Sequence, residues 1–578
     1  MIYSLSITSM QRSRTRTLRN PRVPEFPVNN NVGGFRNSGT KYGLPPNAYT
    51  DCKNIVISED GGFKRRRTAD QLWVEPDSTN GRIHGIFYHE GFWFIRVKGT
   101  NIQTLLTPWD TWTTRQTGYS VSWKDKTTFL SFQATSTAGS ITKTLSEESD
   151  DRFLRVSWTM IPNDHVGKII KIWSEYKLIN GNTDTVIYIQ EKLQGSYSNG
   201  TSIQIYEQVE AVYIFSPGQN VRIWRGGANF ETLPFSYDTA ELQSSWWATN
   251  TGRLMAIKND KKVWISELGT WEFFQKDSFI PAELGGDMTA IKAINKSMVV
   301  YSTSWRGRIL WDNLDNYRID ISETNKGCIA PGSVANWVNV QYYLSKEGIE
   351  YLNAIENSTV MEGISLSDIM SKTFERHDDF SWAQAAVSNG KMYLSIQDWV
   401  YIYDLEKSVK NHKPIFTLAQ YEECSQVWVS DALPGEWTCA EELAWILYFG
   451  QWGKCYYITD EKIWPEETQK ALEYMIEFPI QHYGSKRLMK KIQKYSTYFQ
   501  HNIDLTWART RFRIFLSKDE WDYSMIRDVE NLYNIECNIN ERVYSTSIKI
   551  EVKDMESIVD TQIEFMYSIM EAFVFNKK

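Results

Sequence analysis

The sequence contains none of the short motifs by which many enzymes are recognised. It has no HExxH, no GxSxG, no P-loop and no GxGxxG after an expected strand. No hydrophobic run approaches the length of a membrane span, and the first residues lack the apolar segment of a secretory signal. The sequence therefore predicts no catalytic residue, no metal ligand and no cofactor-binding residue. We expect a protein that is not an enzyme.

Cysteine usage and charge argue against a disulfide-linked protein and against a tight nucleic-acid binder. The six cysteines are scattered and form no CxxC pair, which predicts mostly buried free thiols in a reducing compartment. Cys439 and Cys455 are the one pair considered for a disulfide. The 63 basic and 70 acidic residues give a net charge of −7. Because tight nucleic-acid binding needs a basic excess, that function is not favoured, although DNA could pass the protein without being held.

Two groups of residues could still carry chemistry. The acidic clusters at 147–151 and 375–379 could supply a general acid and base, since a glycosidase needs only two nearby carboxylates, but acidic loop tips are commoner. His84 and His89 flank one expected strand and have no third ligand nearby. Hydrogen-bonded or surface histidines are therefore favoured over a metal site.

Aromatic residues, in contrast, are abundant. They make up 14% of the chain, with 24 Trp and 31 Tyr, and they favour strands and thick sheet-on-sheet contacts. Pairs of short hydrophobic runs recur across Gly, Asp or Asn turns, at residues 89–97, 253–265, 297–311, 340–352, 391–403 and 445–458. From the second copy the spacing is about 43 to 53 residues, roughly one propeller blade. The pattern predicts an all-β fold, a β-propeller of about six blades.

The loss of this period in two places predicts further domains. Pro21, Pro24 and Pro27 exclude a helix in the Arg-rich N-terminal segment, and the strand at 54–57 is expected to close the last blade. A short helix is expected from Pro465 to about Ile476. The expected domains are an extended arm (1–27), the propeller start with its closing strand and first blade (28–106), an inserted β domain (107–235), the remaining blades (236–476) and a C-terminal β-sandwich-like domain (477–578).

Two segments carry a resemblance to a known family. Gly33-Gly34-Phe35, followed by Leu44-Pro45-Pro46-Asn47, by Asn54-Ile55 and by Gly61-Gly62-Phe63-Lys64-Arg65, resembles the N-terminal signature of bacteriophage tail proteins. Lys326-Gly327-Cys328-Ile329-Ala330-Pro331-Gly332-Ser333, leading to Tyr343-Leu344-Ser345, is similar to one blade of the tail hub and nozzle proteins of short-tailed phages. The large insertion is closer to the nozzle type.

The resemblance implies a structural virion protein located in the tail. Such a protein forms a homo-oligomeric ring, expected to be a hexamer, below the portal and its adaptor. It carries tail fibres or spikes, and it retains genomic DNA and lets it pass through the lumen during ejection without binding it tightly. The Arg-rich N-terminal arm would then dock on an acidic neighbour. Trp305, Arg306 and Arg308, at one expected turn, are candidates for facing a partner or the lumen.

Two other functions remain open at this point. A propeller glycosidase or depolymerase would use the acidic loops as carboxylates and the aromatic side chains as sugar platforms. A receptor-binding adhesin would recognise cell-surface glycans through its loops and would act as an isolated monomer.

Overall fold

The computed structural model describes most of residues 81–232 and 246–420, together with the strands within 25–71 and 428–574. Its longer undescribed stretches are 1–24, 29–49, 72–80, 233–245, 354–361, 430–446, 459–472, 479–489, 502–509 and 555–562. The chain divides into two compact units. One, here called the propeller unit, comprises 69–410 and 420–462, and the other, the sandwich unit, comprises 1–68, 411–419 and 463–578.

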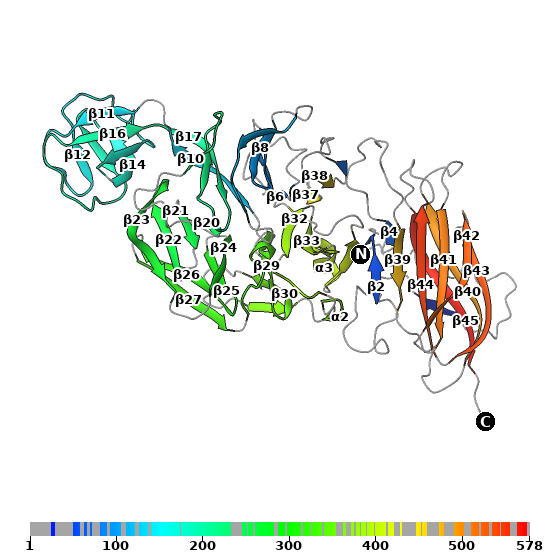
Figure 1. Ribbon diagram of the computed structural model, residues 1–578. Helices are drawn as coiled ribbons and strands as arrows, with labels where there is room; N and C mark the ends of the chain where they lie inside the picture. Colours follow the sequence, from blue (N-terminus) through cyan, green and yellow to red (C-terminus); the bar gives the residue numbers. More distant parts are fainter. Residues whose placement is uncertain are drawn as a thin grey trace, which may run out of the picture. The chain divides into compact units, whose positions relative to one another are not determined.

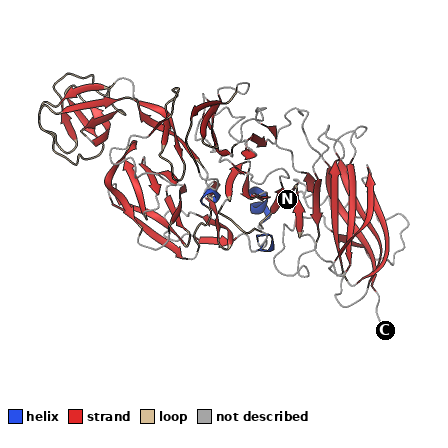
Figure 2. Cartoon of the chain, in the orientation of Figure 1, coloured by secondary structure: helices blue, strands red, loops and turns tan. Residues whose placement is uncertain are grey.

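Nearly all the described secondary structure is antiparallel β-sheet (Figures 1 and 2). Seven sheets have four strands each. Sheet 1 is β6 (Ile83–His89), β7 (Trp93–Lys98), β8 (Asn101–Leu105) and β9 (Thr113–Gln116); sheet 2 is β10 (Thr128–Thr135), β17 (Gln208–Phe215), β18 (Arg222–Trp224) and β19 (Glu231–Thr232); sheet 3 is β20 (Trp246–Asn250), β21 (Arg253–Ile257), β22 (Lys262–Glu267) and β23 (Thr270–Pro281).

The remaining four-stranded sheets follow in chain order. Sheet 4 is β24 (Met288–Ile294), β25 (Ser297–Ser302), β26 (Trp305–Asn313) and β27 (Asn316–Thr324); sheet 5 is β28 (Ala335–Trp337), β29 (Val340–Ser345), β30 (Gly348–Asn353) and β31 (Glu362–Ser365); sheet 6 is β32 (Gln384–Ser388), β33 (Lys391–Ile396), β34 (Trp399–Asp404) and β35 (Phe416–Gln420); sheet 7 is β36 (Trp428–Val429), β37 (Leu447–Gln451), β38 (Lys454–Ile458) and β5 (Asp70–Gln71). The described helices are η1 (Pro331–Ser333), α2 (Ser371–Phe374) and α3 (Leu405–Asn411).

Sheets 1 to 5 pack in chain order through apolar faces. One buried cluster joins sheets 1 and 2, a second joins sheets 2 and 3, a third joins sheets 3 and 4, and a fourth joins sheets 4 and 5. Strand β37 of sheet 7 contacts β6 of sheet 1, so the order of contacts returns to its start. Sheet 7 is completed by β5 from far earlier in the chain, a closure typical of propellers. The predicted all-β propeller is confirmed.

The repeat in the sequence did not reveal sheet 2. About six blades were predicted, whereas the described residues contain seven four-stranded sheets. The first two strands of sheet 2, β10 and β17, are adjacent and antiparallel. In the chain, however, 72 residues lie between Thr135, the last residue of β10, and Gln208, the first of β17. A separate sheet occupies that interval, which hides the period. Sheet 2 therefore lies inside the stretch expected as an inserted domain.

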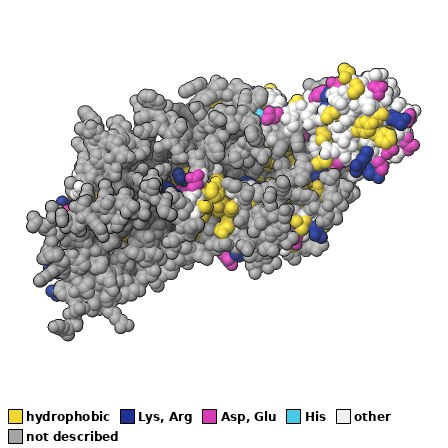
Figure 3. Space-filling model, turned by 180° about the vertical axis from the view of Figure 1, so that it is seen from behind, with side chains coloured by type: hydrophobic (Ala, Val, Ile, Leu, Met, Phe, Trp, Pro, Cys, Tyr) yellow, Lys and Arg dark blue, Asp and Glu magenta, His cyan; other side chains and the backbone are white. Residues whose placement is uncertain are grey.

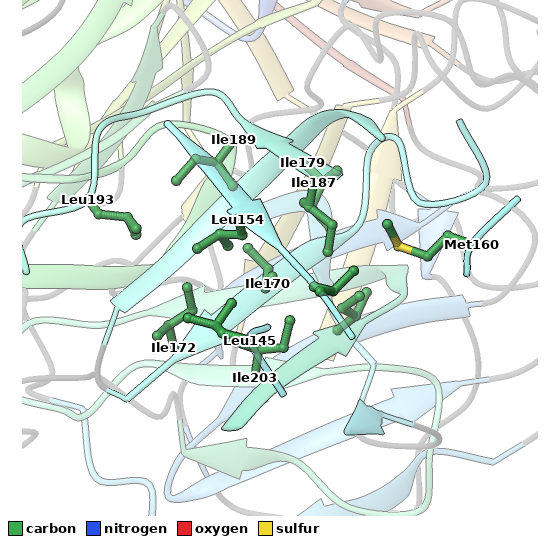
Figure 4. Close-up of a cluster of buried hydrophobic side chains, with 12 residues drawn as sticks. Leu145, Leu154, Met160, Ile170, Ile172, Ile179, Ile187, Ile189, Leu193 and Ile203 are labelled. Carbon is green, nitrogen blue, oxygen red and sulfur yellow. The ribbon is translucent and has the colours of Figure 1, made fainter. Parts of the chain in front are cut away.

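The insertion proper is a six-stranded sheet between β10 and β17. Its order is β11 (Ile141–Thr144), β16 (Ser202–Tyr206), β13 (Ile169–Ile172), β14 (Glu175–Asn182), β15 (Val186–Ile189) and β12 (Phe153–Arg155). A bridge between Leu145 and Val156 links its two outer strands, so the sheet closes on itself. Isoleucine and leucine side chains fill its interior, among them Leu154, Ile170 and Ile203 (Figure 4). The inserted domain expected at 107–235 is wider than this sheet, because those bounds also include β9 of sheet 1 and all four strands of sheet 2.

The sandwich unit unites the two ends of the chain. One sheet has the order β3 (Ile55–Ile57), β4 (Phe63–Arg65), β45 (Ile563–Val574), β40 (Lys490–His501) and β43 (Asn534–Val543), with β1 (Glu25–Val28) also on β45. The other is β2 (Asp51–Lys53), β39 (Glu473–Glu477), β44 (Thr546–Asp554), β41 (Thr510–Lys518) and β42 (Asp522–Glu530). Alternate residues of its central strands are buried, such as Phe512, Ile514 and Leu516, as expected for sheets with one covered face.

Three expectations about the chain ends need correction. The strand at 54–57 does not close the propeller, because β3 pairs with β4 in the sandwich unit, and β5 closes it instead. The expected helix ending near Ile476 is contradicted at its end, where β39 pairs with β44 over five residues. The C-terminal domain thus begins earlier than 477 and includes strands from the first 65 residues. Residues 1–24 of the expected arm lie outside the described residues.

Candidate functional site

The acidic clusters do not form a shared catalytic centre in the described part of the chain. Glu147 pairs with Arg155 at 3.1 Å, and Asp151 pairs with Lys192 at 2.6 Å, in both cases on the surface. Asp379 accepts a hydrogen bond from the backbone N–H of Ser381. Glu375 and Arg376 lie outside the described residues. Glu147, Asp151 and Asp379 therefore make local contacts within their own clusters or with nearby residues.

The histidines of sheet 1 are structural where the structure describes them. His89 is buried, and its Nε2 atom lies 3.0 Å from the Ser131 hydroxyl and 3.3 Å from the Glu210 carboxylate. The backbone carbonyl of His84 accepts a hydrogen bond from the Thr127 N–H. Both contacts join sheet 1 to sheet 2. Among the described residues no group of three or more metal-ligating side chains comes together, and no helix is long and apolar enough to cross a membrane.

Two of the residues expected to face a partner or the lumen are buried instead. Trp305 is in the core between sheets 3 and 4, and Arg306 is fully buried. The Arg306 guanidinium donates a hydrogen bond of 2.6 Å to the Tyr343 hydroxyl on sheet 5. Arg308 is half-buried on the same strand. The sequence could not show this, because the partner hydroxyl is contributed by the next sheet.

The segment Gly327–Val334, which carries part of the family resemblance, joins three sheets. The Cys328 N–H donates to the carbonyl of Ser302 on sheet 4, at 2.8 Å. The Ser333 hydroxyl donates to the Ala330 carbonyl at 2.6 Å and accepts from the Leu344 N–H of sheet 5 at 2.9 Å. Gly332 lies close to the backbone carbonyl of Ala383, just before sheet 6. This segment therefore connects sheets 4, 5 and 6 of the propeller.

The described cysteines are predicted to resist thiol reagents. Cys52, Cys328 and Cys537 form no disulfide and are buried. Burial raises the pKa of the Cys328 thiol from 9.0 to about 12 and that of Cys537 to about 11. The thiolate is the reactive form, so at pH 8 the Cys328 thiolate should be about a thousandfold scarcer than at the ordinary pKa. Peptide mass mapping after iodoacetamide treatment should find all three unlabelled in the native protein and labelled in denaturant. Labelling of Cys328 in the native state would contradict this placement.

Buried ion pairs attach the inserted sheet to sheet 3. Lys177 of β14 lies 2.9 Å from the Glu267 carboxylate at the end of β22, and both side chains are almost inaccessible. Arg253 of β21 pairs with Glu191, whose second oxygen accepts from the Leu268 N–H. The inserted sheet is therefore held in place on the propeller unit by charged groups that are shielded from water.

Aromatic and aliphatic contacts reinforce this attachment. The Tyr176 ring lies parallel to the Phe273 ring of β23. The side chain of Leu178 covers Gly269, which has φ +69° and no room for a side chain. Sequence reasoning missed the whole junction, because its residues alternate with core positions and its partners are 62 or more positions apart in the chain, as with Glu191 and Arg253.

The inserted sheet also carries a surface pocket of about 530 Å³. The β13–β14 turn contributes Trp173, and the segment before β16 contributes Asn199 and Thr201. Lys171, Ser202 and Gln204 from the neighbouring strands β13 and β16 also line it. None of its lining residues is acidic. We take this pocket as a candidate ligand site, to which nothing in the sequence pointed beyond its richness in tryptophan.

The chain matches no known family model and no curated protein. Solved structures similar to it include YCF48 bound to a D1 peptide, with 14% identity over 46% of this chain and 86% of that one, and a TM-score of 0.27. PorZ of Porphyromonas gingivalis, described as an essential bacterial surface component of the type-IX secretion system, has 9% identity over 73% of this chain and 44% of that one, and a TM-score of 0.32. The computationally designed protein Ika8 has 10% identity over 67% of this chain and all of that one, and a TM-score of 0.31.

Likenesses of this strength assign no activity. The sheet topology itself places the chain in the class of all-β proteins built on a propeller, with a closed six-stranded sheet inserted in one of its four-stranded sheets and a sandwich made from both chain ends.

Proposed function

We propose that the chain is a structural virion protein, a ring-forming hub or nozzle component of a short-tailed phage tail. The observation that carries the proposal is the location of the Gly327–Val334 segment. This segment resembles a blade of that family, and its hydrogen bonds link consecutive sheets of the propeller. The residues that resemble the family are therefore residues that hold the propeller together. A protein whose function is structural would be expected to keep such residues.

Physical properties of the fold support the same role. A closed ring of antiparallel sheets leaves few free strand edges, so it can serve as a rigid body in an assembly. A net charge of −7 suits a conduit, since tightly bound phosphates would stall the passage of DNA. Portal, adaptor and fibre proteins would be its partners, and six copies would form the ring. A glycosidase would need two carboxylates at one pocket, and the pocket on the inserted sheet has none.

The proposal is tested on purified virus particles. Mass spectrometry should detect the chain in the particles at low copy number, and cryo-electron microscopy should locate it in a ring below the portal vertex. As a control for adsorption, recombinant chain added to complete particles should be removed when the particles are purified again. Absence of the chain from particles, or a location only at the tips of fibres, would overturn the hub assignment.

A further inference from the structure

Trp173 occupies a position that is unfavourable in two ways. Its side chain is 75% exposed, so most of the indole is in contact with water. Its backbone has φ 55°, in the left-handed region that bulky residues avoid. The flanking residues Ile172 and Glu175 pair directly, so Trp173 is in a two-residue hairpin turn, where Asn and Gly are usual. Local strain of this kind is found most often at functional sites.

Exposed apolar side chains concentrate on the same inserted sheet. Among the described residues, the exposed large hydrophobic side chains are Ile141, Ile161, Val166, Trp173, Tyr188, Val409 and Met525, of which the first five belong to the insertion. Figure 3 shows hydrophobic side chains on this part of the surface, at the upper right, interspersed with charged ones. Trp173 is the most exposed of the seven and the one that lines a pocket.

The polar wall of the pocket is held in place by backbone hydrogen bonds. The Gly200 N–H donates to the carbonyl of Leu145, and the Leu145 N–H donates to the carbonyl of Thr201, at 3.0 and 2.9 Å. The Thr201 N–H also bonds the carbonyl of Ser198. These bonds fix the segment that presents the side chains of Asn199 and Thr201. A preformed wall of hydroxyl and amide groups loses little entropy when a ligand binds.

The floor of the pocket carries a single cation. Lys171 and Gln204 are directly opposite each other on β13 and β16. The Lys171 ammonium lies 5.1 Å from the centre of the Tyr176 ring. A lysine is charged at neutral pH, and the hydrogen bond with Tyr176 raises the pKa of Lys171 further. Lys171 and Trp173 both line the pocket, so one ligand can meet the ammonium and the indole together.

We propose that this pocket binds an acidic saccharide. The flat face of a pyranose ring packs on the Trp173 indole, the sugar carboxylate pairs with the Lys171 ammonium, and the hydroxyl groups bond to Asn199, Thr201 and Gln204. An exposed aromatic platform beside convergent amide and hydroxyl groups suits a sugar, which has apolar faces and polar edges. One cation without any acidic lining residue favours a carboxylate-bearing sugar over a neutral one. This inference does not depend on whether the chain is a virion component.

The test is affinity electrophoresis of the full chain in native gels that contain alginate or polygalacturonate, two uronic acid polymers, with dextran as the neutral polymer. The wild-type chain should be retarded by the uronic acid polymers and not by dextran. Trp173→Ala should weaken the retardation at least tenfold, measured as the polymer concentration that gives half the effect. Lys171→Gln should weaken binding to the uronic acid polymers and reduce the difference from dextran.

Tyr188→Ala is the matched control, because Tyr188 is an exposed aromatic residue of the same sheet outside the pocket. It should leave the retardation unchanged, and circular dichroism should show all three variants folded. The proposal is overturned if neither uronic acid polymer retards the wild-type chain. It is equally overturned if Trp173→Ala binds as well as the wild type, since the retardation would then be due to charge alone.

Discussion

Replacing Gly327 by alanine should lower the stability of the propeller unit by about 3 kcal/mol or more. A Cβ atom at this position would lie closer than 3.0 Å to backbone atoms of Ser302, Thr303 and Ser304, the turn between β25 and β26. Backbone atoms cannot move aside as the end of a flexible side chain can. The hydrogen bond from the Cys328 N–H to the Ser302 carbonyl would be disturbed at the same time, because it is one residue away.

Differential scanning calorimetry should show this loss as a shift of several degrees in the unfolding transition of the propeller. Gly227→Ala is the control, since a Cβ there would meet nothing within 4 Å and its backbone is not in the left-handed region. That variant should unfold at the wild-type temperature. If Gly327→Ala also did so, the close contact between the 327–334 segment and sheet 4 would be refuted.

Replacing Lys177 by alanine should destabilise the attachment of the inserted sheet by about 3 to 5 kcal/mol. The Lys177 ammonium lies 2.9 Å from the Glu267 carboxylate and 3.9 Å from that of Glu175, and all three side chains are less than one tenth exposed. Removal of the cation leaves two carboxylates close together with little access to water. Hydrogen exchange should therefore accelerate over residues 140–206, while the sandwich unit should exchange at its usual rate.

Two further variants distinguish the loss of a buried ion pair from the mere loss of one positive charge. Lys192→Ala removes the cation of an ion pair with Asp151 whose side chains are 62% and 60% exposed, so it should cost less than about 1 kcal/mol. The double change Lys177→Met with Glu267→Leu should restore much of the stability, because an apolar pair of similar size has no desolvation cost. Glu175 still accepts hydrogen bonds from the Gly195 N–H and the Tyr197 hydroxyl in that variant. If Lys177→Ala and Lys192→Ala exchanged alike, Lys177 would not be buried at this junction.

Much of the propeller could be predicted because its strands carry their own signal. Runs such as Val299-Val300-Tyr301 and Tyr342-Tyr343-Leu344 alternate with turns at a blade-like spacing, and these residues are buried in the structure. Sheet 2 could not be found in this way, because β10 and β17 are neighbours only after the insertion has folded between them. The closing strand was misplaced for a similar reason. Both 54–57 and 70–71 are short, and pairing with a distant strand decides which of them completes sheet 7.

The candidate ligand site was beyond prediction for a different reason. Trp173 comes from one segment of the chain and Asn199 and Gln204 from another, and a tryptophan in a strand-rich sequence is more often buried than exposed. Trp305 and Trp264 follow that rule, whereas Trp173 does not.

The pattern of residues alone is enough to show that this chain is an all-β protein with repeated strand pairs, because hydrophobic alternation and turn residues act over a few neighbours. Tertiary structure alone decided which strand closes the propeller, that both chain ends form one sandwich, and that Arg306 and Lys177 are buried. Those outcomes depend on contacts between residues far apart in the chain. A hydrogen bond or an ion pair acts only over a few ångströms, so the fold must bring its partners together before either can form.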